Sequence, residues 1–346
     1  MKRLISVISV MLSVLFLCCC ANTSAETVTP KTEDVVENTD VRVLTVAVEK
    51  GLSENAAAAV DCFAGKIEEI SKGRLKVEKL LCGDVLSEID NGCDIAFGTN
   101  AEFARANGDF LIYSSPFYFA DYNHLTMTLN SKQFIAATQN SNVNLLKAVP
   151  IGAFYDGAYY IVSSREEMYD TLDQYNGKTM NTLGEQPLFE EVLKSLGADA
   201  RIRNEQYMLS NFGKNRNISA MECEITSLSK ITKDEKVDSF HICKSFHRAK
   251  INWLMLSEAA RSSLSSYEMA VITEATAYTI AKNDGIILKN EEESFEAAEK
   301  MGGTVTAINW FEFSVNSEAT FKKSNKYGSL WDWFVYEEVR NIAFES

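Results

Sequence analysis

The chain has 346 residues, of which 48 are acidic and 34 are basic, so its formal net charge is −14 at pH 7. This charge argues against a nucleic-acid partner, whose phosphates would be repelled, and against binding to an anionic membrane surface through basic residues. The length exceeds what one hydrophobic core usually holds, so two lobes are expected for the folded part.

The first 20 residues predict a signal peptide that ends at a lipidated cysteine. A basic start precedes an apolar stretch of roughly 14 residues, which is shorter than the roughly 20 that a membrane-spanning helix needs. The stretch ends at Leu17 and is followed directly by three cysteines, a pattern that resembles the bacterial lipobox. Cys20 is the expected site of lipidation, whereas reading the pattern from Leu15 places the lipid on Cys18. A plain cleaved signal and a marginal membrane helix are the alternatives.

Residues 21–40 are polar and acidic, with little apolar periodicity. Such a segment buries too little surface to offset the entropy of ordering it, so a flexible tether is expected. Five cysteines remain after it, an odd number in no zinc-binding spacing, and buried unpaired thiols are expected for most of them. The sequence leaves open any pairing among these five: Cys62, Cys82, Cys93, Cys223 and Cys243.

From residue 41 the pattern alternates between strands and helices. Residues 41–48 are rich in β-branched side chains and predict a buried strand, and apolar residues at helical spacing predict a helix over 56–70. A strand over 74–80, a short helix over 85–89 and a strand over 94–97 follow. This order predicts a parallel sheet with right-handed crossovers.

Ligands of open parallel sheets bind beyond the carboxyl ends of the strands. Those ends place Glu49, Thr99 and Asn100 among the candidate binding residues. No glycine-rich turn follows the first strand, so the sequence does not support a dinucleotide-binding fold.

A second unit is predicted from about residue 151. Strands are expected over 151–155, 158–162 and 177–181, and an amphipathic helix over 187–196. Farther on, Ser265 to Glu268 fits a capping box, and a helical pattern continues over 266–301. A helix of this length spans about 54 Å, so we expect it to brace two lobes.

Six segments in the same order resemble the solute-binding proteins of tripartite ATP-independent periplasmic (TRAP) transporters, over about residues 41–320. They are GRLKV at 73–77, DIAF at 94–97, PFYFADYNH at 116–124, DQYNGKTMN at 173–181, LKSLGA at 193–198 and WFEF at 310–313. The resemblance implies a two-lobed, periplasmic-binding-protein-like α/β fold, braced by the long helix, with a ligand cleft between the lobes. Lobe I would comprise residues 41–150 and about 240–270, and lobe II residues 151–239 and about 285–346.

The resemblance further implies a receptor that is not an enzyme, with no cofactor and no metal. It would deliver a small molecule to TRAP permease subunits, from the extracytoplasmic face of a bacterial membrane that it reaches through its lipid alone. A helical-repeat lipoprotein is a further candidate partner. The alternatives are a sensor or ligand-delivery lipoprotein of the same fold, and a lipoprotein hydrolase. For the hydrolase, the sequence contains no G-x-S-x-G, P-loop, C-x-x-C or HExxH motif.

The family usually binds organic acids through arginines, because a guanidinium offers a carboxylate a charged, two-pronged donor. The two corresponding positions here are Asn181 and Tyr159. A carboxylate in a closed cleft without a cation is strongly disfavoured. The ligand is therefore expected to be neutral, zwitterionic, cationic or hydrophobic. The remaining candidate ligand contacts are Phe117, Asp156, Tyr207 and His241.

Overall fold

The structure is a computed structural model that describes residues 41–129, 146–164, 167–184, 188–214, 218–231 and 239–341, without the side chains of 229–231. The predicted signal peptide, the tether and the candidate lipidated cysteine lie outside the described residues. None of the helices in these ranges combines the length and the apolar character that crossing a membrane requires.

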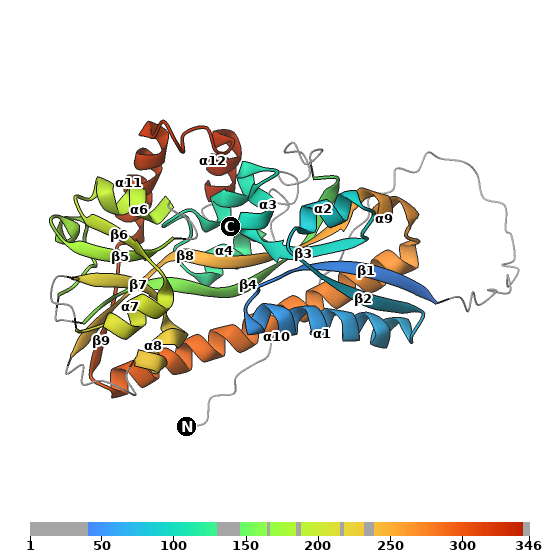
Figure 1. Ribbon diagram of the computed structural model, residues 1–346, viewed down its shortest axis with the longest axis horizontal. Helices are drawn as coiled ribbons and strands as arrows, with labels where there is room; N and C mark the ends of the chain where they lie inside the picture. Colours follow the sequence, from blue (N-terminus) through green and yellow to red (C-terminus); the bar gives the residue numbers. More distant parts are fainter. Residues whose placement is uncertain are drawn as a thin grey trace, which may run out of the picture. The chain divides into compact units, whose positions relative to one another are not determined.

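The strands of the described ranges form one mixed sheet in the order β2-β1-β3-β8-β4-β7-β5-β6, and β9 pairs with β8 (Figure 1). Their bounds are β1 Arg42–Glu49, β2 Leu75–Cys82, β3 Ile95–Thr99, β4 Ala148–Ser163, β5 Thr179–Leu183, β6 Asp199–Arg203, β7 Ala220–Glu224, β8 Phe240–Ser257 and β9 Gly303–Ala307. β1 pairs in parallel with β2 and β3, as predicted. The sheet as a whole is mixed, because β8 runs antiparallel to both β3 and β4.

Two long strands, β4 and β8, connect the two halves of this sheet. β3 pairs with β8 over Asn252 to Leu256, whereas β7 pairs with β4 over Tyr159 to Val162. The first half therefore contains β1 to β3, and the second contains β5 to β7 and β9. The sequence predicted two strands over 151–162, but β4 is continuous, with an irregular register between Tyr155 and Ala158.

The helices flank this sheet (Figure 1). Their bounds are α1 Glu54–Ser71, α2 Val85–Asp90, α3 Asn100–Ala104, α4 Tyr122–Leu129, α6 Leu188–Ser195, α7 Glu205–Asn211, α8 Ile225–Ile231, α9 Glu258–Ser263, α10 Ser266–Lys300, α11 Trp310–Lys323 and α12 Trp333–Asn341, with 3-10 turns η1 Gly108–Ser114 and η3 Leu172–Tyr175. Several of them begin with a side-chain cap. In α1, for example, Ser53 accepts a hydrogen bond from the backbone N–H of Ala56.

The long helix α10 contacts elements of both halves: α1 and β4, and also α8 and β9. In Figure 1 it runs along the sheet from the β1 end to the β9 end. Its start is the predicted capping box, in which the Ser265 hydroxyl accepts from the N–H of Glu268 and the Glu268 carboxylate accepts from the N–H of Ser265.

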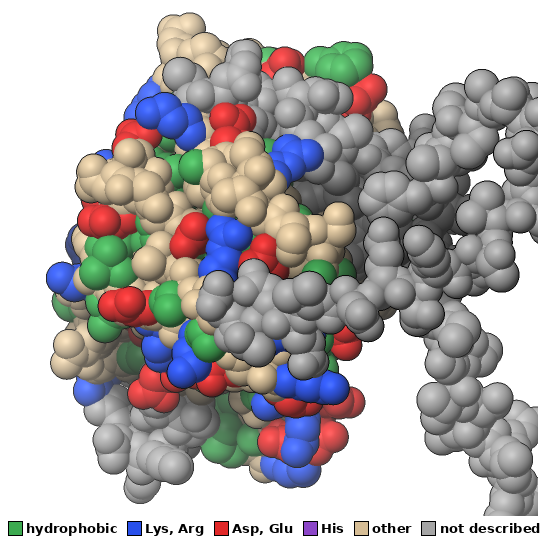
Figure 2. Space-filling model, turned by 90° about the vertical axis from the view of Figure 1, so that its right-hand side faces the viewer, with side chains coloured by type: hydrophobic (Ala, Val, Ile, Leu, Met, Phe, Trp, Pro, Cys, Tyr) green, Lys and Arg blue, Asp and Glu red, His purple; other side chains and the backbone are tan. Residues whose placement is uncertain are grey.

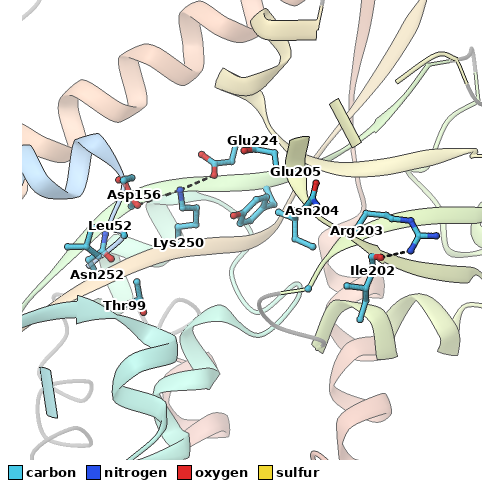
Figure 3. Close-up of a pocket in the computed structure, with 15 residues that line it drawn as sticks. Leu52, Thr99, Asp156, Ile202, Arg203, Asn204, Glu205, Glu224, Lys250 and Asn252 are labelled. Carbon is cyan, nitrogen blue, oxygen red and sulfur yellow. Dashed lines mark hydrogen bonds and ion pairs between the residues drawn. The ribbon is translucent and has the colours of Figure 1, made fainter. Parts of the chain in front are cut away.

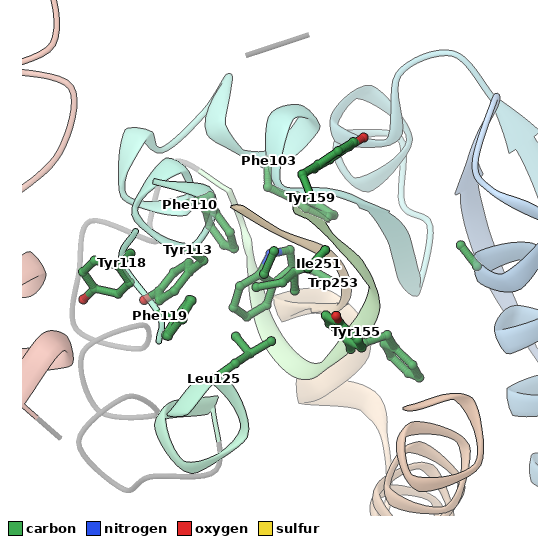
Figure 4. Close-up of a cluster of buried hydrophobic side chains, with 14 of the residues drawn as sticks. Phe103, Phe110, Tyr113, Tyr118, Phe119, Leu125, Tyr155, Tyr159, Ile251 and Trp253 are labelled. Atoms are coloured by element: carbon green, nitrogen blue, oxygen red, sulfur yellow. The ribbon is translucent and has the colours of Figure 1, made fainter. Parts of the chain in front are cut away.

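An aromatic cluster surrounds Trp253 of β8 (Figure 4). The ring centroid of Trp253 lies 5.1 Å from that of Phe110 and 5.2 Å from that of Tyr113. The indole N–H donates to the side-chain oxygen of Asn100 at the start of α3. The cluster therefore fixes the side chain of Asn100.

The five cysteines of the described residues are free; Cys62 is half-buried and the others are buried. At the end of the molecule that carries β2 and α9, the described acidic and basic side chains are intermixed (Figure 2).

Candidate functional site

A cavity of about 600 Å³ lies where the two halves of the sheet meet. On one side it is bordered by Thr99 at the end of β3 and by Asn252 of β8, and on the other by Asn204 and Glu205 at the start of α7 (Figure 3). The side chain of Lys250 lies between these two walls. Residues far apart in the sequence therefore share one space, at the carboxyl end of β3.

A side pocket of about 120 Å³ shares part of this lining, so the two spaces adjoin. Their shared residues are Thr99, Asp156, Tyr159, Lys250 and Asn252. The side pocket is also lined by Asn100, Ala101, Ser114, Arg248, Ala249 and Ile251.

The ammonium of Lys250 is bound by two carboxylates. Its Nζ lies 2.9 Å from Oε1 of Glu224 and 3.5 Å from Oδ2 of Asp156 (Figure 3). Burial on its own lowers the pKa of Lys250, but the two carboxylates outweigh burial and leave that pKa above its ordinary value. Burial raises the pKa of Glu224, against the opposing effect of Lys250. Lys250 is therefore a fixed cation of the cavity.

Arg248 is a second cation, held by buried partners. Its Nη2 lies 3.3 Å from Oε2 of Glu222, and its guanidinium lies 4.2 Å from the ring centroid of Tyr159. Glu222 also accepts from Thr182 and lies 3.2 Å from Nε2 of His247. Burial would raise the pKa of Glu222, but Arg248 and His247 hold that pKa at about 2. Glu222 is therefore ionised and anchors the arginine.

The irregular segment of β4 from Tyr155 to Ala158, which passes between the two halves of the sheet beside the cavity, is held by α10. Nδ2 of Asn283 donates to the carbonyl of Tyr155 at 2.7 Å, and the N–H of Ala158 donates to Oε1 of Glu291 at 3.1 Å. Between these contacts lie Asp156, which borders the cavity, and Gly157, whose φ is +102°. This irregular segment joins the two halves of the sheet.

Four of the predicted site residues, Thr99, Asn100, Asp156 and Tyr159, line the two spaces. Glu49 lies next to them and accepts a 2.7 Å hydrogen bond from the N–H of Thr99. Burial raises the pKa of Glu49.

The other four predicted residues lie outside both spaces. Phe117 is buried against Phe313, with ring centroids 4.8 Å apart. Asn181 lines a separate recess of about 10 Å³ in the second half. Tyr207 is exposed on α7, and His241 lies 2.8 Å from the Thr306 hydroxyl. Their roles in binding stay predictions.

Sequence reasoning missed three residues of β8 that line the site: Arg248, Lys250 and Asn252. Successive side chains of a strand point to opposite faces, so residues two apart share a face. Polar residues at that spacing within an otherwise mostly apolar strand were the available signal. The described residues contain no group of three or more His, Cys, Asp or Glu placed to hold a metal ion.

The fold is similar to solved TRAP periplasmic solute-binding proteins. The protein of Ochrobactrum anthropi, with its C-terminus bound in the ligand-binding pocket, matches with a TM-score of 0.72 and 14% identity, over 89% of this chain and 98% of that chain. The apo open protein of Escherichia fergusonii matches with a TM-score of 0.69 and 18% identity, over 87% of this chain and 99% of that chain. The protein of Ralstonia eutropha H16, with bound (S)-2-acetolactate, matches with a TM-score of 0.64 and 15% identity, over 88% of this chain and 99% of that chain.

These comparisons confirm the predicted two-lobed α/β fold of periplasmic binding proteins. No family model matches the sequence. No curated protein matches it either.

Proposed function

We propose that the chain is an extracytoplasmic receptor of the TRAP solute-binding family, which captures a small molecule between its two lobes and passes it to TRAP permease subunits. One observation carries the proposal: a cavity of about 600 Å³ is bordered by residues of both halves of the sheet, and β4 and β8 connect those halves. In a fold similar to TRAP receptors, this is where a solute would bind.

Binding would close the lobes, because a ligand that contacts both walls binds the closed state more tightly than the open one. Thr99 and Asn252 would contact it from the first half, and Asn204 and Glu205 from the second. The segment at Asp156 and Gly157 would absorb the change in backbone angles.

The proposed ligand is neutral, zwitterionic, cationic or hydrophobic, and not an ordinary carboxylate. The family's usual arginine positions are Asn181 and Tyr159 in this chain. In the cavity, Lys250 already lies between Glu224 and Asp156, so an anionic solute would compete with two fixed carboxylates for it.

The location and the partners belong to the same proposal. The N-terminal sequence supports lipid anchoring through Cys20 at the outer face of a bacterial membrane. TRAP permease subunits would receive the solute, and a helical-repeat lipoprotein is a second candidate partner. A receptor also returns its ligand unchanged, which separates it from a hydrolase.

A ligand screen with a blocked cavity tests the proposal. The full chain, purified in detergent, is screened by thermal shift against a metabolite library, and each molecule that stabilises it is recovered and identified. Ile202→Trp fills the cavity border from a side chain that is 41% exposed, and Ile286→Trp makes the same change at a 48% exposed position on α10.

We expect at least one small molecule to stabilise the wild type and Ile286→Trp, to be recovered unchanged, and to lose its effect on Ile202→Trp. Chemical conversion of that molecule would support a hydrolase instead. Stabilisation that survives in Ile202→Trp would place the binding site elsewhere.

A further inference from the structure

Three residues that line the side pocket carry buried N–H donors that have no hydrogen-bond partner within the described structure. They are Nδ2 of Asn100, Nε of Arg248 and Nδ2 of Asn252, and these side chains are 3%, 4% and 2% exposed. A buried donor without an acceptor destabilises the folded state, so a group of such donors requires a structural explanation. All three belong to residues that line one space of about 120 Å³, where a ligand oxygen would supply the missing acceptor.

The orientation of two of these donors is fixed by neighbours. The indole N–H of Trp253 can only donate, so it must be the side-chain oxygen of Asn100 that accepts from it. The amide N–H₂ of Asn100 is then the group without a partner. Arg248 is held by the carboxylate of Glu222 and by the ring of Tyr159. The side chains of Asn100 and Arg248 are therefore preorganised, which lowers the entropy lost on binding.

The side pocket is lined by residues with N–H donors, whereas carboxylates predominate in the lining of the main cavity. It is lined by three carboxylates, Asp156, Glu205 and Glu224, and by two cations, Lys250 and Arg203. Lys250 is shared by Asp156 and Glu224, and Glu205 has the Ser227 hydroxyl as a donor at 2.8 Å. Asp156 and Glu205 both raise the pKa of Glu224 by repulsion, after the larger effect of its burial. A ligand cation in this cavity would relieve that repulsion.

We propose that the solute is an amino-acid-like zwitterion, with its carboxylate in the side pocket against Asn100, Arg248 and Asn252, and its ammonium in the main cavity beside Glu205 and Glu224. The assignment rests on the proposed receptor function and narrows its ligand class. In this arrangement Arg248 of β8 supplies the guanidinium that Asn181 and Tyr159 do not.

A matched panel tests the two charges separately. The full chain in detergent is titrated with each of the twenty amino acids and with ω-amino acids, and beside each with the amine that lacks the carboxylate and the hydroxy acid that lacks the ammonium. Affinity is measured by calorimetry. We expect at least one amino acid to bind about tenfold or more tightly than both of its analogues, because each analogue leaves buried charged or donor groups unpaired.

Isosteric variants test the pocket. Asn100→Asp and Asn252→Asp each replace a donor by an acceptor of the same shape, and Asn100→Asp keeps the acceptor for Trp253. Asn290→Asp makes the same change at an exposed position of α10, outside both spaces, and serves as the control. Both pocket variants are expected to lose tenfold or more in affinity for that amino acid, and the control to keep it. Melting curves of the apo proteins show that each variant is folded.

Several results would overturn the assignment: no zwitterion in the panel binds, a hydroxy acid or an amine binds as tightly as its amino acid, or both pocket variants keep wild-type affinity. A solute of another class, found in the metabolite screen and blocked by Ile202→Trp, would overturn the zwitterion and leave the receptor intact. Failure of every metabolite in that screen would count against the receptor itself.

Discussion

The carboxamide of Asn283 donates a 2.7 Å hydrogen bond to the backbone carbonyl of Tyr155. The long helix α10 therefore holds β4 where this strand passes from one half of the sheet to the other. Tyr155 contacts the same helix through its hydroxyl, which lies 2.9 Å from Oε2 of Glu291. These buried polar contacts hold α10 against the part of β4 that precedes Asp156, a residue of the cavity border.

Glu291 is expected to make the folded state less stable as the pH rises. Burial raises its pKa to about 7 from 4.5, so between these values unfolding releases a proton and rising pH favours the unfolded state. Glu291→Gln keeps the shape and removes the charge. Above pH 7 the variant should exceed the wild type by about 3 kcal/mol in free energy of unfolding, and the two should converge near pH 4.5. Urea denaturation across this range measures the difference.

The exposed neighbour Glu292 provides the control, since Glu292→Gln should follow the wild-type curve at every pH. Parallel curves for Glu291→Gln and the wild type would show that the buried carboxyl does not titrate in this range.

Gly157 is expected to be required at the β4 crossing. Its φ of +102° is a conformation that residues with a Cβ rarely adopt, although a Cβ there would meet nothing closer than 3.7 Å. Gly157→Ala should lower the free energy of unfolding by about 1 kcal/mol or more through backbone strain. Gly65→Ala in α1 should instead raise it by about 0.5–1 kcal/mol, because alanine favours a helix. Equal effects of the two changes would rule out strain at Gly157.

The buried Glu222 should contribute strongly to stability at neutral pH. Its pKa of about 2 lies below the ordinary 4.5, so its contribution is present above pH 4.5 and is lost as the pH falls towards 2. Glu222→Gln leaves Arg248 without its counter-ion and should cost about 3 kcal/mol or more at pH 7. The deficit should shrink below pH 4.5.

The exposed Glu293 offers the comparison, because Glu293→Gln should change stability by less than about 0.5 kcal/mol. A deficit of Glu222→Gln that is the same at pH 7 and pH 3 would contradict an ionised Glu222.

Ser53 links a helix cap to the cavity. Its hydroxyl accepts from the N–H of Ala56 and donates to Asp156 at 2.7 Å. Ser265 caps α10 in the same way, outside the lining of both spaces. Either serine changed to alanine should cost about 1 kcal/mol of stability. Calorimetry should show weaker solute binding for Ser53→Ala than for Ser265→Ala. Equal affinities in the two variants would show that Ser53 has no role in solute binding.

The sequence predicted the fold well where the period of the side chains was clear. The β-branched strand at 42–49, helix α1 and the capped helix α10 were all recognised, because local spacing and caps determine them. The continuous β4 was not, because Asp156 and Gly157 interrupt its pattern at an irregularity that only the pairing with β8 defines.

The candidate site was predicted only in part. Thr99 and Asn100 follow from the rule that sites lie at the carboxyl ends of parallel strands. Arg248, Lys250 and Asn252 lie on a strand that is antiparallel to its neighbours β3 and β4, to which that rule does not apply. Asn181 was placed in the site by its position in a motif, and the structure shows it lining a separate recess.

The central claim is that one small molecule binds between the two lobes. Its most direct test is the mass of the full chain, isolated from the cells that make it, under native and then denaturing conditions. We expect one additional small molecule per chain that is present in the native spectrum, is released on denaturation and fails to bind Ile202→Trp. Equal native and denatured masses, or a bound molecule that Ile202→Trp retains, would contradict it.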